Sequence, residues 1–311
     1  MGFARLSLRY FIELSYDGTA YCGWQIQPNG ESVQGTLQKA LAALLREDIA
    51  VTGAGRTDAG VHAAKMVAHV DIPDELSIST THLEYRLNAI LPHDIAIHKI
   101  YPVADDAHAR FSARARTYYY YVHTRKSPFL RDRSWRLVKT PDFESMNLAA
   151  AVLLEYEDFT SFSKVNTDTK TNICHVRCAR WVQLSDHEWR FEITADRFLR
   201  NMVRAIVGTL MEVGRGLLTV DGFRKVIEQK DRSAAGDSVP ARGLFLQEVE
   251  YGPFPEPSPV LEGSSVSLSR AREGGENTYE ETQSVDNNQM PANLSPRPNR
   301  GGAGGGASLC G

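Results

Sequence analysis

The chain has 311 residues, a formal net charge of −3, 42 % apolar residues and 23 % charged residues. This apolar fraction is enough for a buried core in one large domain or two smaller ones, and it excludes wholesale disorder. The longest strongly apolar run, 148–154, is far shorter than the roughly 20 residues that cross a bilayer. With no basic-then-apolar segment at the N-terminus, we expect a cytoplasmic protein that does not bind membranes.

Residues 1–104 predict the order strand, helix, strand, strand, helix, strand. Alternation of apolar and polar residues, rich in aromatic and β-branched types, marks the strands, and Val33, Leu37 and Leu41 recur at helical spacing. The predicted strands are 9–16, 49–52, 65–72 and 95–103, and the predicted helices are 33–45 and 82–91.

Residues 105–254 repeat that order with one extra helix. The predicted strands are 115–123, 173–184, 188–194 and 244–251, and the predicted helices are 143–154, 201–213 and 220–229. Thr140 and Pro141 are expected to start the first of these helices, as N-cap and first-turn proline. Two copies of the β-α-β-β-α-β order predict an α+β fold with two ferredoxin-like halves.

The C-terminal segment 255–311 differs in composition from the rest. It is rich in Gly, Pro, Ser and Asn, and it contains seven acidic and four basic residues, so the remaining chain is neutral. Large apolar residues are scarce and show no period. We therefore predict a disordered low-complexity tail.

Basic residues cluster in two places within the neutral part. Eight of them lie in 110–136 against the single acid Asp132, and Arg197, Arg200 and Arg204 have spacings that place them on one stripe of a helix and its entry. Local basic surface on a neutral protein suits a polyanion held at a defined place. A solvated surface with salt bridges is the alternative.

The cysteines predict neither a disulfide framework nor a metal site. Four cysteines are few for a chain of this length. Cys174 and Cys178 bracket His175, but on a strand they would lie roughly 13 Å apart. Buried structural cysteines are the preferred interpretation.

The segment 53–63 stands out between two predicted strands. It has three glycines in eight positions, so its backbone can bend and approach a ligand closely, and it carries Arg56, Asp58 and His62. It is neither a P-loop nor a dinucleotide-binding fingerprint. By itself it fits either a reactive loop or a turn capped by Thr57 and Asp58.

This segment resembles the signature of the tRNA pseudouridine synthase A family, and the resemblance extends over residues 8–251. Further matching segments follow in order: Tyr16-Asp17-Gly18-Thr19, Gly23-Trp24-Gln25, Ser32-Val33-Gln34-Gly35, 109–118, Phe159-Thr160-Ser161-Phe162, 198–211 and Gly243-Leu244. The resemblance implies the pseudouridine synthase fold, with an active-site cleft between the two halves. It does not reach the tail.

The implied reaction is the isomerisation of uridine to pseudouridine in the anticodon stem-loop of tRNA, at tRNA positions 38, 39 and 40. The bond from uracil N1 to the ribose breaks, and the base is rejoined through C5. Because the product is an isomer, no cofactor is expected. Uracil can spread negative charge over its own carbonyls, so one carboxylate can replace the two of a glycosidase. The resemblance implies that this carboxylate is Asp58; whether it attacks the ribose, attacks the base or removes a proton stays open.

Four residues are implied to bind the substrate. Arg204, with Arg200 as a less favoured substitute, would keep Asp58 ionised, and Arg56 would fill space or hold phosphate as the base leaves its stack. Tyr118 matches the tyrosine that stacks on uracil and can take part in proton transfer, although it also fits a plain strand aromatic. Leu244 would contact the base or belong to the core. We expect His62 to be structural.

The remaining basic residues are expected to form the tRNA surface, since RNA stems are gripped through phosphates and shape. The residues assigned to it are Arg110, Arg114, Arg116, Arg197 and Arg200. The resemblance also implies a homodimer with tRNA across both subunits. Two other functions remain open: a non-catalytic RNA-binding module and a small-molecule enzyme on ferredoxin-like halves.

Overall fold

The first part of the chain folds in the predicted order of elements. The computed structural model describes residues 7–28, 30–73, 79–164 and 171–253. Here the elements are β1 (Ser7–Tyr16), α1 (Val33–Leu45), β2 (Thr52–Gly53), β3 (His62–Pro73), α2 (Thr80–Ile90) and β4 (Ile95–Pro102). The short strand predicted at 49–52 instead begins at Thr52, because Ile49 and Val51 are buried in the core while Thr52 and Gly53 pair with β3.

The second part also follows the predicted order. Its elements are β5 (Ala113–His123), β6 (Trp135–Arg136), α3 (Phe143–Val152), β7 (Val176–Ser185), β8 (Glu188–Ala195), α4 (Met202–Gly214), α5 (Val220–Gln229) and β9 (Leu244–Tyr251). The predicted first residue of α3, Phe143, is confirmed, but the predicted N-cap, Thr140, is wrong. Asp142 is its N-cap, and its carboxylate accepts hydrogen bonds from the backbone N–H groups of Glu144 and Ser145.

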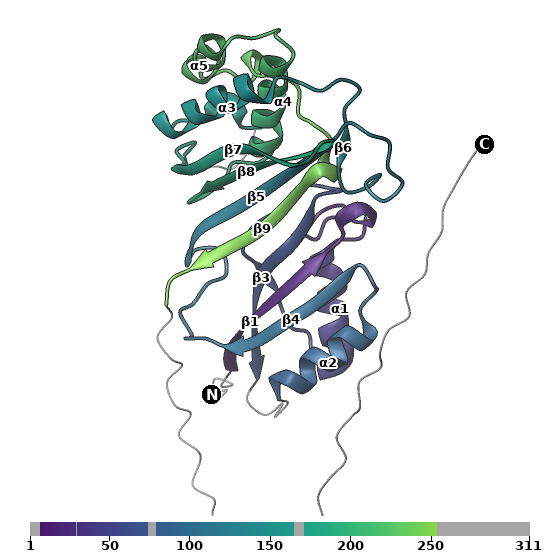
Figure 1. Cartoon of the computed structure of the whole chain (residues 1–311). Coiled ribbons are helices and arrows are strands. Elements are labelled where there is room, and N and C mark those ends of the chain that lie inside the picture. Colours follow the sequence, from purple (N-terminus) through teal and green to yellow (C-terminus); the bar gives the residue numbers. More distant parts are fainter. Residues whose placement is uncertain (1–6, 29, 74–78, 165–170, 254–311) are drawn as a thin grey trace, which may run out of the picture. The chain divides into compact units, whose positions relative to one another are not determined.

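A single mixed sheet contains all of these strands, as the predicted α+β class requires. Its order is β4-β1-β3-β9-β5-β8-β7, with β2 beside β3 and β6 beside β5 (Figure 1). The last strand, β9, lies between the two parts: it is parallel to β3 and antiparallel to β5. The tail predicted at 255–311 lies outside the described residues. Among those described, no helix has the length and apolarity needed to cross a membrane.

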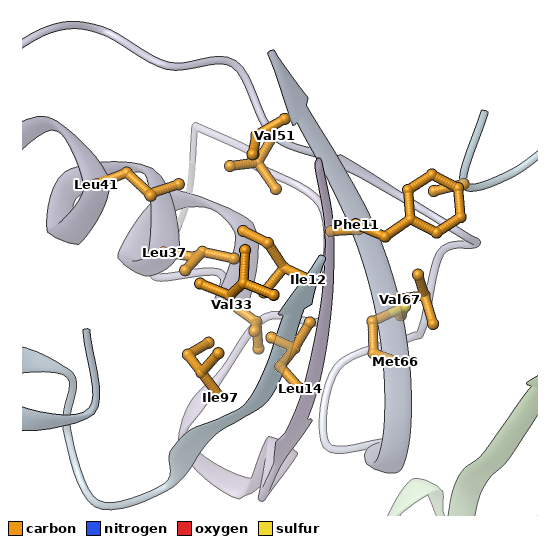
Figure 2. Packing of buried hydrophobic residues seen from close by; sticks show 14 of the residues in the cluster. Phe11, Ile12, Leu14, Val33, Leu37, Leu41, Val51, Met66, Val67 and Ile97 are labelled. Carbon is orange, nitrogen blue, oxygen red and sulfur yellow. The ribbon is translucent and has the colours of Figure 1, made fainter. Parts of the chain in front are cut away.

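Two clusters of buried side chains form the core. In the first, Val33, Leu37 and Leu41 on α1 face Ile12 and Leu14 on β1 (Figure 2). Helix α1 forms because these apolar residues recur every three to four positions and because the Ser32 hydroxyl caps its first turn.

The second cluster packs α3, α4 and α5 against β5, β7 and β8. Its members include Phe162, Phe191 and Phe223, all fully buried. Tyr118 on β5 packs against both clusters. The boundary between the two clusters therefore lies beside the predicted substrate-binding tyrosine.

Candidate active site

A cleft of about 1620 Å³ is lined by residues from both parts of the sheet. The first part contributes 54–59 from the glycine-containing loop, together with Val61. The second part contributes Arg116 and Tyr118 on β5, the segment 196–204, and Leu244 at the start of β9. A small-molecule site usually measures roughly 300–1,000 Å³. This cleft is larger, as a site for part of a macromolecule would be.

The loop that carries Asp58 is fixed by contacts on both sides of that residue. The buried Thr57 hydroxyl lies 2.9 Å from the Tyr16 hydroxyl, and the Thr57 carbonyl accepts a hydrogen bond from the Trp24 backbone N–H. On the other side, the Gly60 N–H donates to the Tyr21 carbonyl. Gly60 has φ +75°, a conformation that glycine adopts without strain. Asp58 is therefore held on a rigid loop.

Two arginines reach the Asp58 carboxylate. Arg204 Nη1 donates to Asp58 Oδ2 at 3.2 Å, and Arg200 Nε lies 3.9 Å from Oδ1. Arg204 is itself held, because its Nε donates to the Val239 carbonyl at 2.8 Å. The Asp58 and Arg204 side chains are about three-quarters buried, whereas Arg200 is exposed. The structure thus brings together the predicted pair, with Arg200 as a second, more distant cation.

The expectation that Arg197, Arg200 and Arg204 share one helix stripe is wrong. Helix α4 begins at Met202, and its N-cap Asn201 has the left-handed φ of +67°. The chain therefore bends between Arg200 and Arg204, and this bend lets both approach Asp58 from different directions. Arg197 also lines the cleft.

Tyr118 and Leu244 line the same cleft as Asp58. The Tyr118 ring is partly buried and meets the Phe198 ring edge-on, with centroids 5.1 Å apart. Burial raises the pKa of the Tyr118 hydroxyl to about 12, so it is protonated at neutral pH. Leu244 is buried within the second core cluster and still borders the cleft, so both of its predicted roles are compatible with its position.

The arginines assigned to RNA binding occupy three different environments. Arg110 is exposed at the cleft, and Arg56 is exposed there without a hydrogen bond or ion pair to any described residue. Arg114 is not among the residues that line the cleft; its guanidinium lies against Gly252. Arg116 lines the cleft, but its guanidinium donates to the carbonyls of Ala54, Arg110 and Asp196 at 3.0, 2.6 and 2.8 Å.

Arg116 therefore has a structural role that was not predicted from the sequence: its guanidinium holds three segments together. Its three acceptors belong to the Asp58 loop, to the segment before β5 and to the segment before α4. Each of these segments contributes residues to the cleft. In the sequence, Arg116 is one of several basic residues in a cluster. No local pattern distinguishes an arginine that holds segments together from one that binds a phosphate.

The cleft is strongly basic. The described residues that line it include eight basic side chains: Arg56, Arg110, Arg116, Lys164, Arg197, Arg200, Arg204 and Arg232. Of these same lining residues, only Asp58 and Asp196 are acidic. Asp196 Oδ1 accepts the backbone N–H groups of His175 and Arg197, so this carboxylate stabilises a turn. Asp58 is left as the carboxylate placed to meet a substrate.

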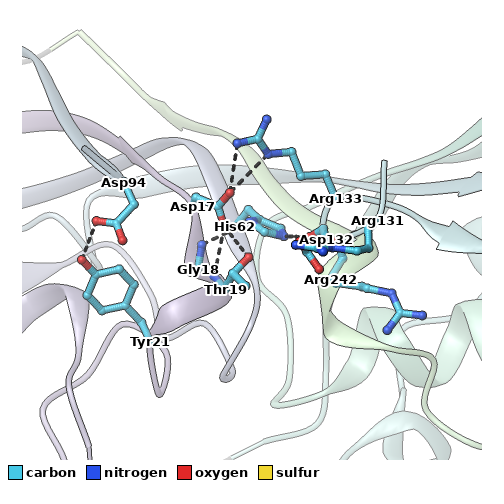
Figure 3. Close-up of polar contacts among 10 residues, drawn as sticks. All are labelled: Asp17, Gly18, Thr19, Tyr21, His62, Asp94, Arg131, Asp132, Arg133 and Arg242. Atoms are coloured by element: carbon cyan, nitrogen blue, oxygen red, sulfur yellow. Dashed lines mark hydrogen bonds and ion pairs between the residues drawn. The ribbon is translucent and has the colours of Figure 1, made fainter. Parts of the chain in front are cut away.

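His62, from the same loop motif, lies in a separate polar cluster with Asp17 and Arg133 (Figure 3). Its Nδ1 accepts the Gly18 N–H, so Nε2 carries the hydrogen and donates to the carbonyls of Asp132 and Arg242. Burial lowers the pKa of the imidazole below its ordinary value, and the nearby Asp17 carboxylate opposes this shift. The ring joins three remote segments, in agreement with the structural role predicted for it.

The three described cysteines, Cys22, Cys174 and Cys178, are free thiols that give no indication of a metal site. Cys174 is buried and precedes β7, so the prediction that it shares a strand with Cys178 is wrong; its N–H donates to the Glu157 carbonyl outside the sheet. Within the described ranges, no group of three or more His, Cys, Asp or Glu side chains is arranged to hold a metal ion.

Comparisons with known proteins identify the family of this chain. A family model described as tRNA pseudouridine synthase matches residues 14–112 and 149–252. The tRNA pseudouridine synthase A of Bacteroides thetaiotaomicron is 61 % identical over 245 residues, covering 78 % of this chain and 90 % of that protein. The protein of the same name from Bacillus subtilis is 41 % identical over 249 residues, covering 78 % of this chain and 99 % of that protein. The chain therefore belongs to the tRNA pseudouridine synthase A family.

Proposed function

We propose that this protein converts uridine to pseudouridine in the anticodon stem-loop of tRNA, at tRNA positions 38, 39 and 40, with Asp58 as its catalytic residue and without a cofactor. tRNA pseudouridine synthase A is an isomerase, and the membership of this chain in that family supports the proposed reaction class. The target base must leave its stack to reach the floor of a cleft. A cleft of about 1620 Å³ has room for an everted nucleotide and its neighbours.

One observation supports the proposal most strongly: among the described residues that line this basic cleft, Asp58 is the one carboxylate left available for a substrate. Asp58 is partly exposed and paired with Arg204 at 3.2 Å, and the surrounding arginines suit an RNA backbone. A carboxylate is the form needed for a nucleophile or a base, and the Arg204 guanidinium donates a hydrogen bond to it. The Arg204 side chain also holds the carboxylate in one position, so less entropy is lost when the reactive geometry forms.

The other predicted residues take roles that fit their environments. Tyr118 would stack on the uracil and, being protonated, could donate a hydrogen bond to it, while Leu244 would contact the apolar part of the base. Arg56, which has no described partner, is free to hold a phosphate or fill the space left by the everted base. Arg110, Arg197 and Arg200 would bind RNA phosphates.

For Arg114 and Arg116 we revise the expected roles. Arg116 would position the walls of the cleft through its three carbonyl contacts, since few of its donors remain for RNA. Arg114 would contact RNA only outside the cleft, because it does not line it.

The same proposal covers the organisation of the chain. Residues 1–104 and 105–254 would be two ferredoxin-like halves with the cleft between them. The strand order supports this, since β4-β1-β3-β2 and β9-β5-β8-β7 have the same relative order. A cytoplasmic homodimer with tRNA across both subunits is part of the proposal, and light scattering coupled to size-exclusion chromatography would test the dimer.

The decisive experiment incubates the purified protein with unmodified tRNA and maps pseudouridine by carbodiimide treatment and primer extension. We expect pseudouridine at positions 38 to 40 where these are uridine, and its loss in Asp58→Asn. Asp196→Asn is the matched control, because it changes an acid in the same cleft but keeps the oxygen that accepts two N–H groups. Asp58→Asn acting at the wild-type rate would refute the catalytic assignment.

The two other functions give different results in the same experiment. A non-catalytic RNA-binding module would bind tRNA in a salt-sensitive manner and form no pseudouridine. A small-molecule enzyme would not bind tRNA even at low salt.

A further inference from the structure

An exposed aromatic ring stands at the cleft with no role in the reaction described above. Phe111 is 75 % exposed and lines the cleft, where the only other exposed large apolar side chain among the described residues is Ile26. A single exposed apolar ring is ordinary on a protein surface, but this ring lies at a cleft lined by basic side chains. Its position beside Arg110 and Arg116 therefore calls for a physical reason.

The ring is presented by a rigid turn. The His108 imidazole accepts the N–H groups of Arg110 and Phe111, and the His108 N–H donates to the Ser112 hydroxyl. Arg116 donates to the Arg110 carbonyl as well. A surface ring on a mobile loop would have few such bonds, so the backbone of Phe111 is pre-organised.

The ring is also anchored to the core through other rings. Phe11 in the core lies 6.5 Å from His69, His69 lies 4.6 Å from His108, and His108 lies 4.3 Å from Phe111, as centroid distances. The Arg110 guanidinium lies 5.6 Å from the Phe111 centroid. The Phe111 ring therefore contacts His108 and Arg110, while most of its surface faces solvent at the cleft.

From this geometry we propose that Phe111 is a stacking platform for an unpaired nucleobase next to the target uridine. This inference rests on the proposed function, since it assumes that RNA enters the cleft. Proteins that hold single-stranded RNA combine a basic groove with aromatic rings on which bases stack. The described residues supply both features: basic side chains along the cleft and one rigid, exposed ring at its mouth. When the target base leaves its stack, a neighbouring base loses a stacking partner, and the Phe111 ring replaces it.

The test combines binding, activity and crosslinking on the full-length protein. Phe111→Ala should weaken tRNA binding roughly 5- to 100-fold, the range for loss of one base–aromatic stack. Phe111→Trp should bind as wild type or more tightly, whereas Phe111→Leu, which is apolar but not aromatic, should behave like Phe111→Ala. The matched control is Phe129→Ala: Phe129 is 86 % exposed in the same basic region but does not line the cleft.

The position of the contact is tested directly with a tRNA transcript that carries 5-iodouridine one nucleotide from the target, on either side in turn. After irradiation, we expect one of the two transcripts to crosslink to the peptide that contains Phe111, as identified by mass spectrometry. No crosslink to that peptide from either transcript would overturn the proposal, and so would equal losses in Phe111→Ala and Phe129→Ala.

Activity and oligomeric state distinguish a stacking ring from a ring at a protein interface. If Phe111→Ala changes the oligomeric state in light scattering but not tRNA affinity per subunit, the ring belongs to a protein interface and the proposal fails. If the wild-type protein forms no pseudouridine, the proposed function fails. If it forms pseudouridine and Phe111→Ala matches it in binding and rate, only the stacking role fails.

Discussion

Gly23 controls the position of the Asp58 loop, and Gly23→Ala tests this control. Gly23 has φ +95°, and a Cβ added there would lie 2.3 Å from the Thr57 carbonyl oxygen and 3.1 Å from the Asp58 carbonyl carbon. Ordinary contact begins at 3.4 Å, so the two segments must separate by about 1.1 Å. The Trp24 N–H donates to the same Thr57 oxygen, so the displacement also breaks a hydrogen bond.

The expected loss has two parts. The positive φ costs about 1–2 kcal/mol of unfolding free energy for any residue with a Cβ. The displacement of the loop moves the Asp58 carboxylate relative to Arg204 and the bound uridine, and a shift of about 1 Å in a reacting group lowers kcat about 100-fold. We expect tRNA affinity to change much less, because Arg110, Arg197 and Arg200, three of the four arginines proposed to hold RNA phosphates, lie on other segments.

Single-turnover pseudouridine formation, tRNA binding and urea unfolding measure these quantities separately. Gly216→Ala is the control, since Gly216 has φ +72° and no heavy atom within 4 Å of the added Cβ. It should lose stability from the backbone strain alone and retain kcat. A Gly23→Ala protein whose kcat stays within a few-fold of wild type would refute the idea that this contact sets the loop position.

Two further predictions concern the Asp58 partner and a buried histidine. Arg204→Lys should lower kcat about 10-fold or more in single-turnover assays with little change in tRNA affinity. In Arg204 two separate nitrogens of a planar group contact the Val239 carbonyl and the Asp58 carboxylate, and the single nitrogen of a lysine does not reproduce this fixed geometry. Wild-type kcat would contradict this prediction. Burial, with smaller effects of neighbouring cations, lowers the pKa of His69 from 6.5 to about 4. The stabilisation that comes from burying neutral His69 is therefore complete above pH 6.5 and is lost as pH falls toward 4. The total loss in unfolding free energy is about 3 kcal/mol. In urea titrations at several pH values, His69→Asn should flatten this dependence, while His93→Asn at an exposed position should keep it; equal slopes in the two variants would count against the assignment.

The local sequence determined the order of the elements and drew attention to the Asp58 loop. Apolar spacing along 33–45 predicts α1, and the alternation that continues to Tyr16 predicts β1, because each element must bury one face against the core. The loop at 53–63 stood out by its glycines and its reactive side chains, but only the family resemblance favoured a reactive loop over a capped turn. The N-cap of α3 was not predicted correctly, because Thr140 and Asp142 are both good caps and only the backbone geometry decides between them.

Only the tertiary structure decided which side chains meet. Arg204 pairs with Asp58 across 146 residues of sequence, and Arg116 joins three segments that no local pattern connects. The register shift in β5 between Ala113 and Ala115 places Arg114 outside the cleft, although simple alternation would put it on the face of Arg116. The physical reason is that local propensity fixes the conformation of each segment. Contacts between distant side chains depend instead on strand register, on bulges and on where helices begin, and these features are set only when the whole sheet assembles.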